Sequence, residues 1–221
     1  MASTDAGERR SWELLAASDP AVVAGRAAVS FDSTSGSYRV LAFGRRFSVH
    51  PGERRILSLE PEGEVFLKLH AGFFRLTLLW YLVKATEARP SGYLVKPSGL
   101  PGGDIFIKGS HILPLAELAA KYATRPGDFL AAGAILGGAA AAYGDAAVAL
   151  WPLPKVPTTL ILWTEDDEFP ARADLLFDRT CTAHLPLDIL WSVALLSVQT
   201  LLGPATTLCD AMPRHDLPAV S

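Results

Sequence analysis

Four consecutive acidic residues form the densest group of chemically active side chains in the sequence. Glu165, Asp166, Asp167 and Glu168 follow a strongly apolar run and precede a Phe-Pro pair. Adjacent carboxylates repel one another, so such a run is tolerated in water, on a cation or against a basic partner. In a loop, Asp166, Asp167 and Glu168 can converge on a hard cation such as Mg²⁺ or Ca²⁺. A divalent-cation site, a protein-partner surface and a solvated turn, the usual fate of charge runs, are the three interpretations.

A glycine-rich stretch with one histidine is the second candidate site. Histidine transfers protons and binds metals near neutral pH, which makes His111 the candidate ligand. Ser110 beside it, and the Gly102-Gly103 pair before it, complete a predicted cofactor-binding set. The glycines lack the lysine of a P-loop and the GxGxxG order of a dinucleotide site. A helix cap at Ser110-His111 and a turn with positive φ at Gly102-Gly103 are the structural alternatives.

Composition limits the classes of partner. Half of the 221 residues are hydrophobic and only 19% are charged, which predicts a substantial core rather than a disordered chain. The net charge of −3 argues against nucleic acid as a partner. From residue 156 onward there are nine acidic residues and three arginines, so we expect a protein partner, if one binds, at the acidic C-terminal third.

Cysteine content and apolar runs bear on the compartment. Cys181 and Cys209 are too few for a structural zinc site or a disulfide framework, which favours the cytoplasm. The N-terminus has no apolar core or cleavage pattern of a secretory signal. Residues 185–202 have helical apolar spacing but contain Asp188, so they predict a buried core helix and no membrane span.

Periodicity and turn residues predict one compact α+β domain over residues 1–203, with a mixed or antiparallel sheet packed with several helices. Residues 204–221 lose periodicity and predict a loosely ordered tail. The Gly44-Arg45 pair predicts a type II′ hairpin turn, and residues 172–177 fit either a strand or a helix. Helices are expected within 8–28 (split near Asp19-Pro20), 73–84, 111–122, 125–137 and from 186 onward; strands are expected at 38–43, 46–50, 54–59, 146–151 and 158–163.

The remaining aromatic and titratable residues receive structural interpretations. The tryptophans in apolar segments are expected in the core rather than on a stacking platform. Asp178 is expected to form an exposed ion pair with its neighbour Arg179. The other histidines do not form a metal-binding pair. The tryptophans are Trp80, Trp151, Trp163 and Trp191, and the histidines are His70, His184 and His215.

Short motifs in a fixed order carry a family resemblance. They are Leu100-Pro101-Gly102-Gly103, Gly109-Ser110-His111, Leu136-Gly137-Gly138, Gly144-Asp145, Pro152-Leu153-Pro154-Lys155-Val156-Pro157, Trp163, Asp166-Asp167-Glu168-Phe169-Pro170-Ala171 and Phe177-Asp178. This set, together with the apolar helix around residues 78–82, resembles the family called domain of unknown function 3786, found in anaerobic bacteria and archaea. The family has no assigned activity. Some relatives carry an iron–sulfur domain like those of corrinoid proteins, which a chain with two cysteines lacks.

Three functional hypotheses follow. The preferred one is a soluble accessory protein that binds a cofactor or a partner, tied through the resemblance to corrinoid, heme or metal-cofactor metabolism. In that case His111 becomes a candidate axial ligand of a tetrapyrrole. One alternative is a hydrolase or transferase that uses a divalent cation held by the acidic loop and His111. The other is a docking subunit of a larger enzyme complex.

Overall fold

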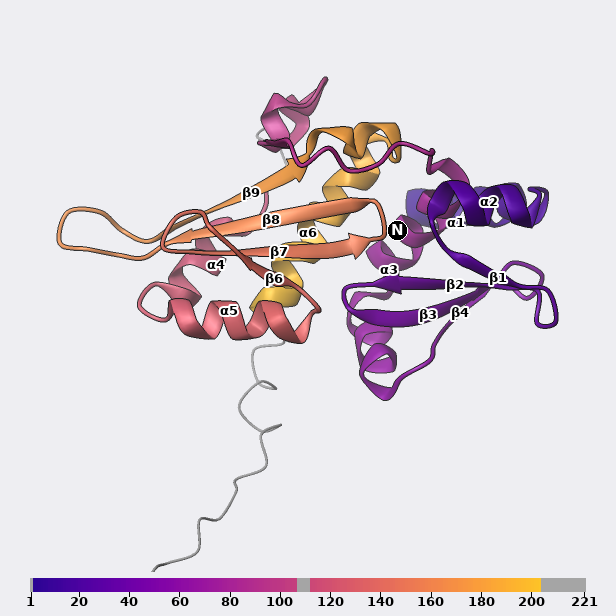
Figure 1. Ribbon diagram of the computed structural model, residues 1–221, viewed down its shortest axis with the longest axis horizontal. Coiled ribbons are helices and arrows are strands. Elements are labelled where there is room, and N and C mark those ends of the chain that lie inside the picture. The colour runs from indigo at the N-terminus through magenta and orange to yellow at the C-terminus, as the bar shows by residue number, and fades with distance from the viewer. Residues whose placement is uncertain (1, 107–111, 204–221) are drawn as a thin grey trace, which may run out of the picture.

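The computed structural model describes residues 2–106 and 112–203, which form two antiparallel sheets with helices packed around them (Figure 1). The fold is therefore α+β, as the sequence predicts. The elements are α1 (Ala2–Ala16), α2 (Pro20–Ala27), β1 (Ser30–Asp32), β2 (Ser37–Ala42), β3 (Arg45–His50), β4 (Arg55–Ser58), α3 (Pro61–Lys84), β5 (Leu94–Val95), η1 (Pro97–Gly99), η2 (Gly103–Phe106), α4 (Leu115–Tyr122), α5 (Pro126–Ile135), β6 (Ala139–Ala141), β7 (Ala146–Leu153), β8 (Val156–Trp163), β9 (Arg172–Asp178), η4 (Arg179–Ala183) and α6 (Leu187–Leu202).

The first sheet is a meander of β1, β2, β3 and β4 in sequence order. Its central hairpin pairs Ala42 with Arg45, so the two turn residues are Phe43 and Gly44. Their φ angles are 48° and 70°, which is the pattern of a type I′ turn. The predicted II′ turn at Gly44-Arg45 is wrong by one position, because glycine occupies the second turn position rather than the first.

The second sheet has the order β5-β9-β8-β7-β6. The segment that fitted either strand or helix is strand β9, paired along its length with β8. Helix α5 packs on β7, α4 on β9, and α6 on both β7 and β8 (Figure 1). The α5–β7 approach is close, since a Cβ atom on Gly133 would lie 2.4 Å from the Val148 side chain.

Helix α3 connects the two halves of the molecule and packs against α1 and α6. It begins at Pro61, not at residue 73 as the apolar run predicted. Proline in the first turn followed by Glu62 and Glu64 is typical of a helix N-terminus, so the sequence does contain a signal for the observed start. The helix is interrupted at His70, which has non-helical angles of φ −119° and ψ 15°. The side chain of His70, at this kink, lines a cavity between α3, α5 and α6.

The two sheets meet where the β2–β3 turn touches the second half of the chain. The Phe43 N–H donates to the Trp151 carbonyl at 2.8 Å. Gly44 packs directly on Gly137, where a Cβ on Gly137 would lie 2.7 Å from the Gly44 Cα. The Trp151 side chain itself is 42% exposed, so its predicted core position is wrong. It is the exposed position of β7.

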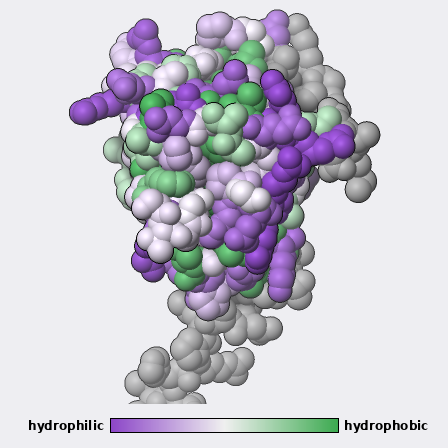
Figure 2. Space-filling model, turned by 90° about the vertical axis from the view of Figure 1, so that its right-hand side faces the viewer, coloured by the Kyte–Doolittle hydropathy of each residue, from purple (hydrophilic) through white to green (hydrophobic). Residues whose placement is uncertain are grey.

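Most of the buried apolar residues of both sheets belong to one continuous cluster. Ten residues of helix α6 are buried and eight of them are apolar members of this cluster, in keeping with the predicted core helix. By length and composition α3 also passes the test for a membrane span, a property that core helices of soluble proteins share. On the side formed by the first sheet, hydrophobic residues lie scattered among hydrophilic ones (Figure 2). The predicted tail, residues 204–221, lies outside the described residues.

Candidate functional site

The acidic run forms an exposed turn between β8 and β9. Glu165, Asp166, Asp167 and Glu168 are all exposed at the surface. The Asp166 Oδ1 accepts hydrogen bonds from the backbone N–H groups of Glu168 at 2.9 Å and Phe169 at 2.7 Å. The Asp166 N–H donates to the Phe169 carbonyl at 3.0 Å. Asp166, one of the three predicted metal ligands, therefore stabilises the turn through its own hydrogen bonds.

The turn contacts elements far from it in the sequence and borders a cavity of about 580 Å³ whose walls include Asp145, Asp166 and Arg172. The Glu165 N–H donates to the Ala123 carbonyl at 3.2 Å, and the Arg172 guanidinium lies 4.1 Å from the centre of the Trp163 ring. Hydrogen bonds from the Thr164 backbone and hydroxyl lower the pKa of Asp145. Within residues 2–106 and 112–203, no three His, Cys, Asp or Glu side chains are grouped so that they could hold a metal. Cation binding by Asp166, Asp167 and Glu168 stays a prediction.

The predicted cofactor set divides into described and undescribed residues. Gly102 has φ 77°, the positive value that the turn interpretation requires. A Cβ on Gly103 would lie 2.0 Å from the Pro97 carbonyl oxygen, so glycine is required there by close backbone packing. Ser110 and His111 lie outside the described residues. The predicted proximity of His111 to the acidic loop therefore stays a prediction.

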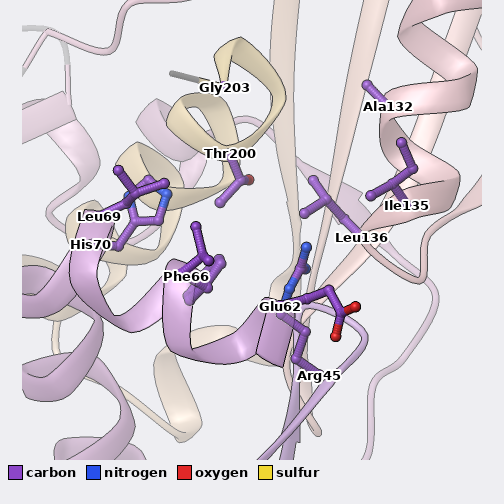
Figure 3. Close-up of a pocket in the computed structure, with 11 residues that line it drawn as sticks. Arg45, Glu62, Phe66, Leu69, His70, Ala132, Ile135, Leu136, Thr200 and Gly203 are labelled. Carbon is purple, nitrogen blue, oxygen red and sulfur yellow. The ribbon is translucent and has the colours of Figure 1, made fainter. Parts of the chain in front are cut away.

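A cavity of about 340 Å³ lies where the start of α3, the end of α5 and the end of α6 converge (Figure 3). We call it the His70 pocket. Exposed apolar side chains border it: Val65 and Leu69 on α3 and Ile135 on α5 are each more than half exposed. The residues that give the pocket its chemical character are Arg45, Phe66, Leu69, His70, Ile135 and Leu136.

His70 supplies an imidazole to one wall of the pocket (Figure 3). Its ring centre lies 4.8 Å from that of Phe66. Burial, and then the positive charge of Arg45, lower the pKa of His70, so the ring is neutral near pH 7. A neutral imidazole has one nitrogen lone pair available to accept a hydrogen bond or bind a metal.

Arg45 supplies a guanidinium to the opposite part of the pocket. Its Nη1 donates to the Phe43 carbonyl at 2.9 Å, and its Cζ lies 5.4 Å from the centre of the Phe66 ring. Its Nε is buried and has no hydrogen-bond partner. Burial lowers the pKa of Arg45, although the charges of Glu62 and Glu60 act in the opposite direction.

Asp178 is buried, which corrects the predicted exposed ion pair with Arg179. Its carboxylate accepts hydrogen bonds from the Ser91 hydroxyl, the Gly92 N–H at 2.6 Å and both the N–H and hydroxyl of Thr180. Burial alone raises the pKa of Asp178, but these hydrogen bonds together lower it below the usual value. Asp178 thus begins η4 and fixes the loop that leads into β5.

His184 is a second buried histidine, away from the pocket. Its Nδ1 accepts the Thr86 N–H at 3.3 Å, so the proton of the neutral ring lies on Nε2, which has no partner. Burial, and then the nearby Lys155, lower the pKa of His184. The Lys155 ammonium in turn donates to the carbonyls of Arg26 and Thr86. These contacts join α2, the end of α3 and the β7–β8 turn, which is a structural role.

Arg45 and His70 are the residues that sequence reasoning missed. In the sequence, Arg45 lies in a predicted turn and His70 is one of several scattered histidines. The available signal was a histidine followed by Ala71-Gly72 inside a long apolar segment, because glycine near a polar residue marks a helix irregularity. No pattern in the sequence connects Arg45 with His70, since the cavity joins elements far apart in the chain.

Comparison with known proteins identifies a family. No curated protein and no solved structure matches the chain. A protein-family model matches residues 19–200, which begins well before the motifs at residues 100–178 that carried the resemblance. The matched range contains Arg45, His70 and the acidic turn. The chain belongs to the family described as domain of unknown function, DUF3786.

Proposed function

We propose that the protein is an accessory protein that binds a small organic ligand or cofactor in the His70 pocket. The observation that carries this proposal is a cavity with apolar walls that contains one neutral imidazole and one guanidinium. Ligand sites are typically concave, mostly apolar and equipped with a few polar groups that orient the ligand. The volume of about 340 Å³ lies at the lower end of the usual range of about 300–1,000 Å³.

The tetrapyrrole version of this proposal assigns the axial ligand to His70 instead of His111. A neutral imidazole beside an aromatic ring suits that role, since histidine is a common axial ligand of heme. The cavity is smaller than a whole heme or corrinoid, so His70 and Phe66, with the exposed Val65 and Leu69, would hold such a group only in part.

The other hypotheses stay predictions. The hydrolase or transferase alternative needs His111 beside the acidic turn, and His111 is outside the described residues. The docking alternative has the exposed acids and Phe169, which is 66% exposed. A cavity of about 580 Å³ also lies beside the acidic turn. The His70 pocket is preferred because its walls are mainly apolar and hold a partly buried imidazole and guanidinium.

The test uses two neighbouring alanines of α5. Ala132 lines the pocket, whereas Ala131 is exposed and does not. Nile red, a neutral apolar dye, is titrated against the wild type, Ala132→Phe and Ala131→Phe by fluorescence. We expect saturable binding that Ala132→Phe weakens at least tenfold and Ala131→Phe leaves unchanged, because only the larger side chain at position 132 fills the cavity. Equal binding by both variants, or none by the wild type, contradicts the proposal.

A heme titration tests the tetrapyrrole version separately. The Soret band of added heme is followed with the wild type and with His70→Ala. Coordination by His70 predicts a shifted Soret band in the wild type that is lost in His70→Ala. An unshifted band in the wild type removes the tetrapyrrole version and leaves the proposal for smaller ligands intact.

A further inference from the structure

Among the described residues, Arg45 is the charged group that lies both in the His70 pocket and partly out of water. It is the first residue of β3, and its side chain extends from the sheet toward Phe66 (Figure 3). Within the described part of the chain its one hydrogen bond goes to the Phe43 carbonyl. A guanidinium has five N–H donors, so most of its donor capacity is not used by the protein.

The acidic residues nearest to Arg45 do not neutralise it. The Glu60 carboxylate is engaged by the neighbouring Arg46, whose Nε lies 2.6 Å from Glu60 Oε1. Glu62 lines the mouth of the pocket but is exposed, and no ion pair within 4.0 Å joins it to Arg45 in the described part of the chain. Solvent therefore screens Glu62 more strongly than the half-buried Arg45.

The buried Nε of Arg45 makes the unused donors costly. An unsatisfied buried polar group destabilises a protein, and the effect is larger when the group is charged. The protein supplies no acceptor for this atom. A carboxylate matches the fork of a guanidinium and accepts two parallel hydrogen bonds from it.

The ends of the pocket also differ in charge. Arg45 lies beside the first turn of α3, where the helix dipole favours an anion. Thr200 and Gly203, at the C-terminal end of α6, line another part of the pocket, and neither residue carries a charge. A ligand with one anionic end therefore has a single favoured orientation, with its apolar body against Phe66, Leu69 and Leu136.

Building on the proposed binding function, we infer that the natural ligand is an apolar carboxylic acid whose carboxylate pairs with Arg45. Two sources share this chemistry: an aliphatic acid, and a ring cofactor with carboxylate side chains. Both present one anionic group on a body that fits apolar walls.

Isothermal titration calorimetry with octanoate and 1-octanol tests the inference, because the two probes differ mainly in the charged end. A charge-assisted hydrogen bond contributes about 1.5–3 kcal/mol, so octanoate should bind wild type about 10–100-fold more tightly than octanol. Arg45→Gln should remove this preference while octanol still binds, which shows that the variant is folded. Arg46→Gln, at an exposed neighbouring arginine, should keep the preference. Glu62→Gln should tighten octanoate binding alone.

Protoporphyrin IX and its dimethyl ester distinguish the two sources. A preference for the free acid that depends on Arg45, with weak octanoate binding, indicates a ring cofactor, whereas the reverse indicates an aliphatic acid. Equal binding of acid and neutral partner by the wild type in both pairs overturns the inference. If Nile red binding then still responds to Ala132→Phe, only the carboxylate assignment has failed. If it does not, the proposed binding function has failed as well.

Discussion

The acidic turn and the His70 pocket contrast in how each is built. The turn places four charges within consecutive residues, yet these side chains lie at the surface and one of them holds the turn itself. The pocket gathers fewer polar groups, from elements separated by more than a hundred residues, around a cavity. The turn is conspicuous by its charge density in the sequence. The pocket is conspicuous in the structure, because partly buried side chains from several elements converge there. A group removed from water interacts more strongly with a ligand than one that is solvated.

The largest difference between the two regions is expected for their phenylalanines. Phe66 is buried against Phe43, Phe47 and Phe74, so Phe66→Ala should lower the free energy of unfolding by about 3–5 kcal/mol. Phe169 in the acidic turn is mostly exposed, and Phe169→Ala should change the free energy of unfolding by less than about 0.5 kcal/mol. Urea denaturation of both variants measures the difference. Similar losses for both would mean that the turn is packed as tightly as the pocket.

A second comparison probes the joint beneath the pocket. Gly44 has φ 70°, and a Cβ there would lie 2.8 Å from the Leu136 and Gly137 backbone, which cannot move aside easily. Gly44→Ala should cost about 3 kcal/mol through left-handed strain plus steric overlap. Gly36 has φ 61° but open space around it, so Gly36→Ala should show the strain alone, about 1 kcal/mol. Equal losses in the free energy of unfolding for Gly44→Ala and Gly36→Ala would contradict a close contact between Gly44 and Gly137.

The buried histidines predict a pH dependence that the exposed acids do not share. The pKa values of His70 and His184 are lowered in the folded protein, so the unfolded chain takes up protons first as the pH falls. Stability should therefore decrease as the pH drops below about 6.5 and level off once the folded histidines protonate. A further loss should begin below about pH 4, where Asp178 and other hydrogen-bonded carboxylates are protonated.

Urea midpoints measured between pH 5 and 8 test this dependence. His70→Gln and His184→Gln should each flatten the curve below about pH 6.5, the ordinary pKa of histidine. A wild-type midpoint that rises as the pH is lowered through this range would show that the folded histidines bind protons more readily than the unfolded ones, contrary to their burial.

The smallest effect is expected within the acidic turn. Asp166→Ala removes the acceptor of two backbone N–H groups, and in this exposed position the loss should be about 0.5–1 kcal/mol. Asp167→Ala, the matched control, removes a carboxylate with no hydrogen bond or ion pair in the described structure and should be neutral within error. A thermal denaturation series resolves the two. A larger loss for Asp167 would indicate a contact that the turn geometry does not contain.

Local patterns predicted most of the secondary structure, for reasons visible in particular residues. Asp19-Pro20 separates α1 from α2 because the Asp19 side chain caps α2 and proline occupies its first turn. Alternating apolar residues predicted the β2–β3 hairpin, although the turn slipped by one residue. Such features depend on neighbours within a few positions, which is the range that sequence reasoning covers.

The candidate site was much less predictable. Its residues come from β3, α3, α5 and α6, and only tertiary packing brings them together. Asp178 illustrates the same limit, since its burial depends on Ser91 and Gly92, which lie more than eighty residues away. Of the four acids that are adjacent in the sequence, Asp166 lines the cavity beside the turn and the other three do not, which adjacency alone does not reveal.

Chemical-shift mapping with 1-octanol tests the central claim most directly, because this neutral probe does not depend on the carboxylate inference. Backbone ¹H–¹⁵N spectra are recorded as octanol is added to the wild type. The account predicts saturable shifts for the amides of Arg45, Phe66, His70 and Leu136, and none for residues 164–171. Saturable shifts confined to residues 164–171, with the pocket amides unmoved, would contradict it.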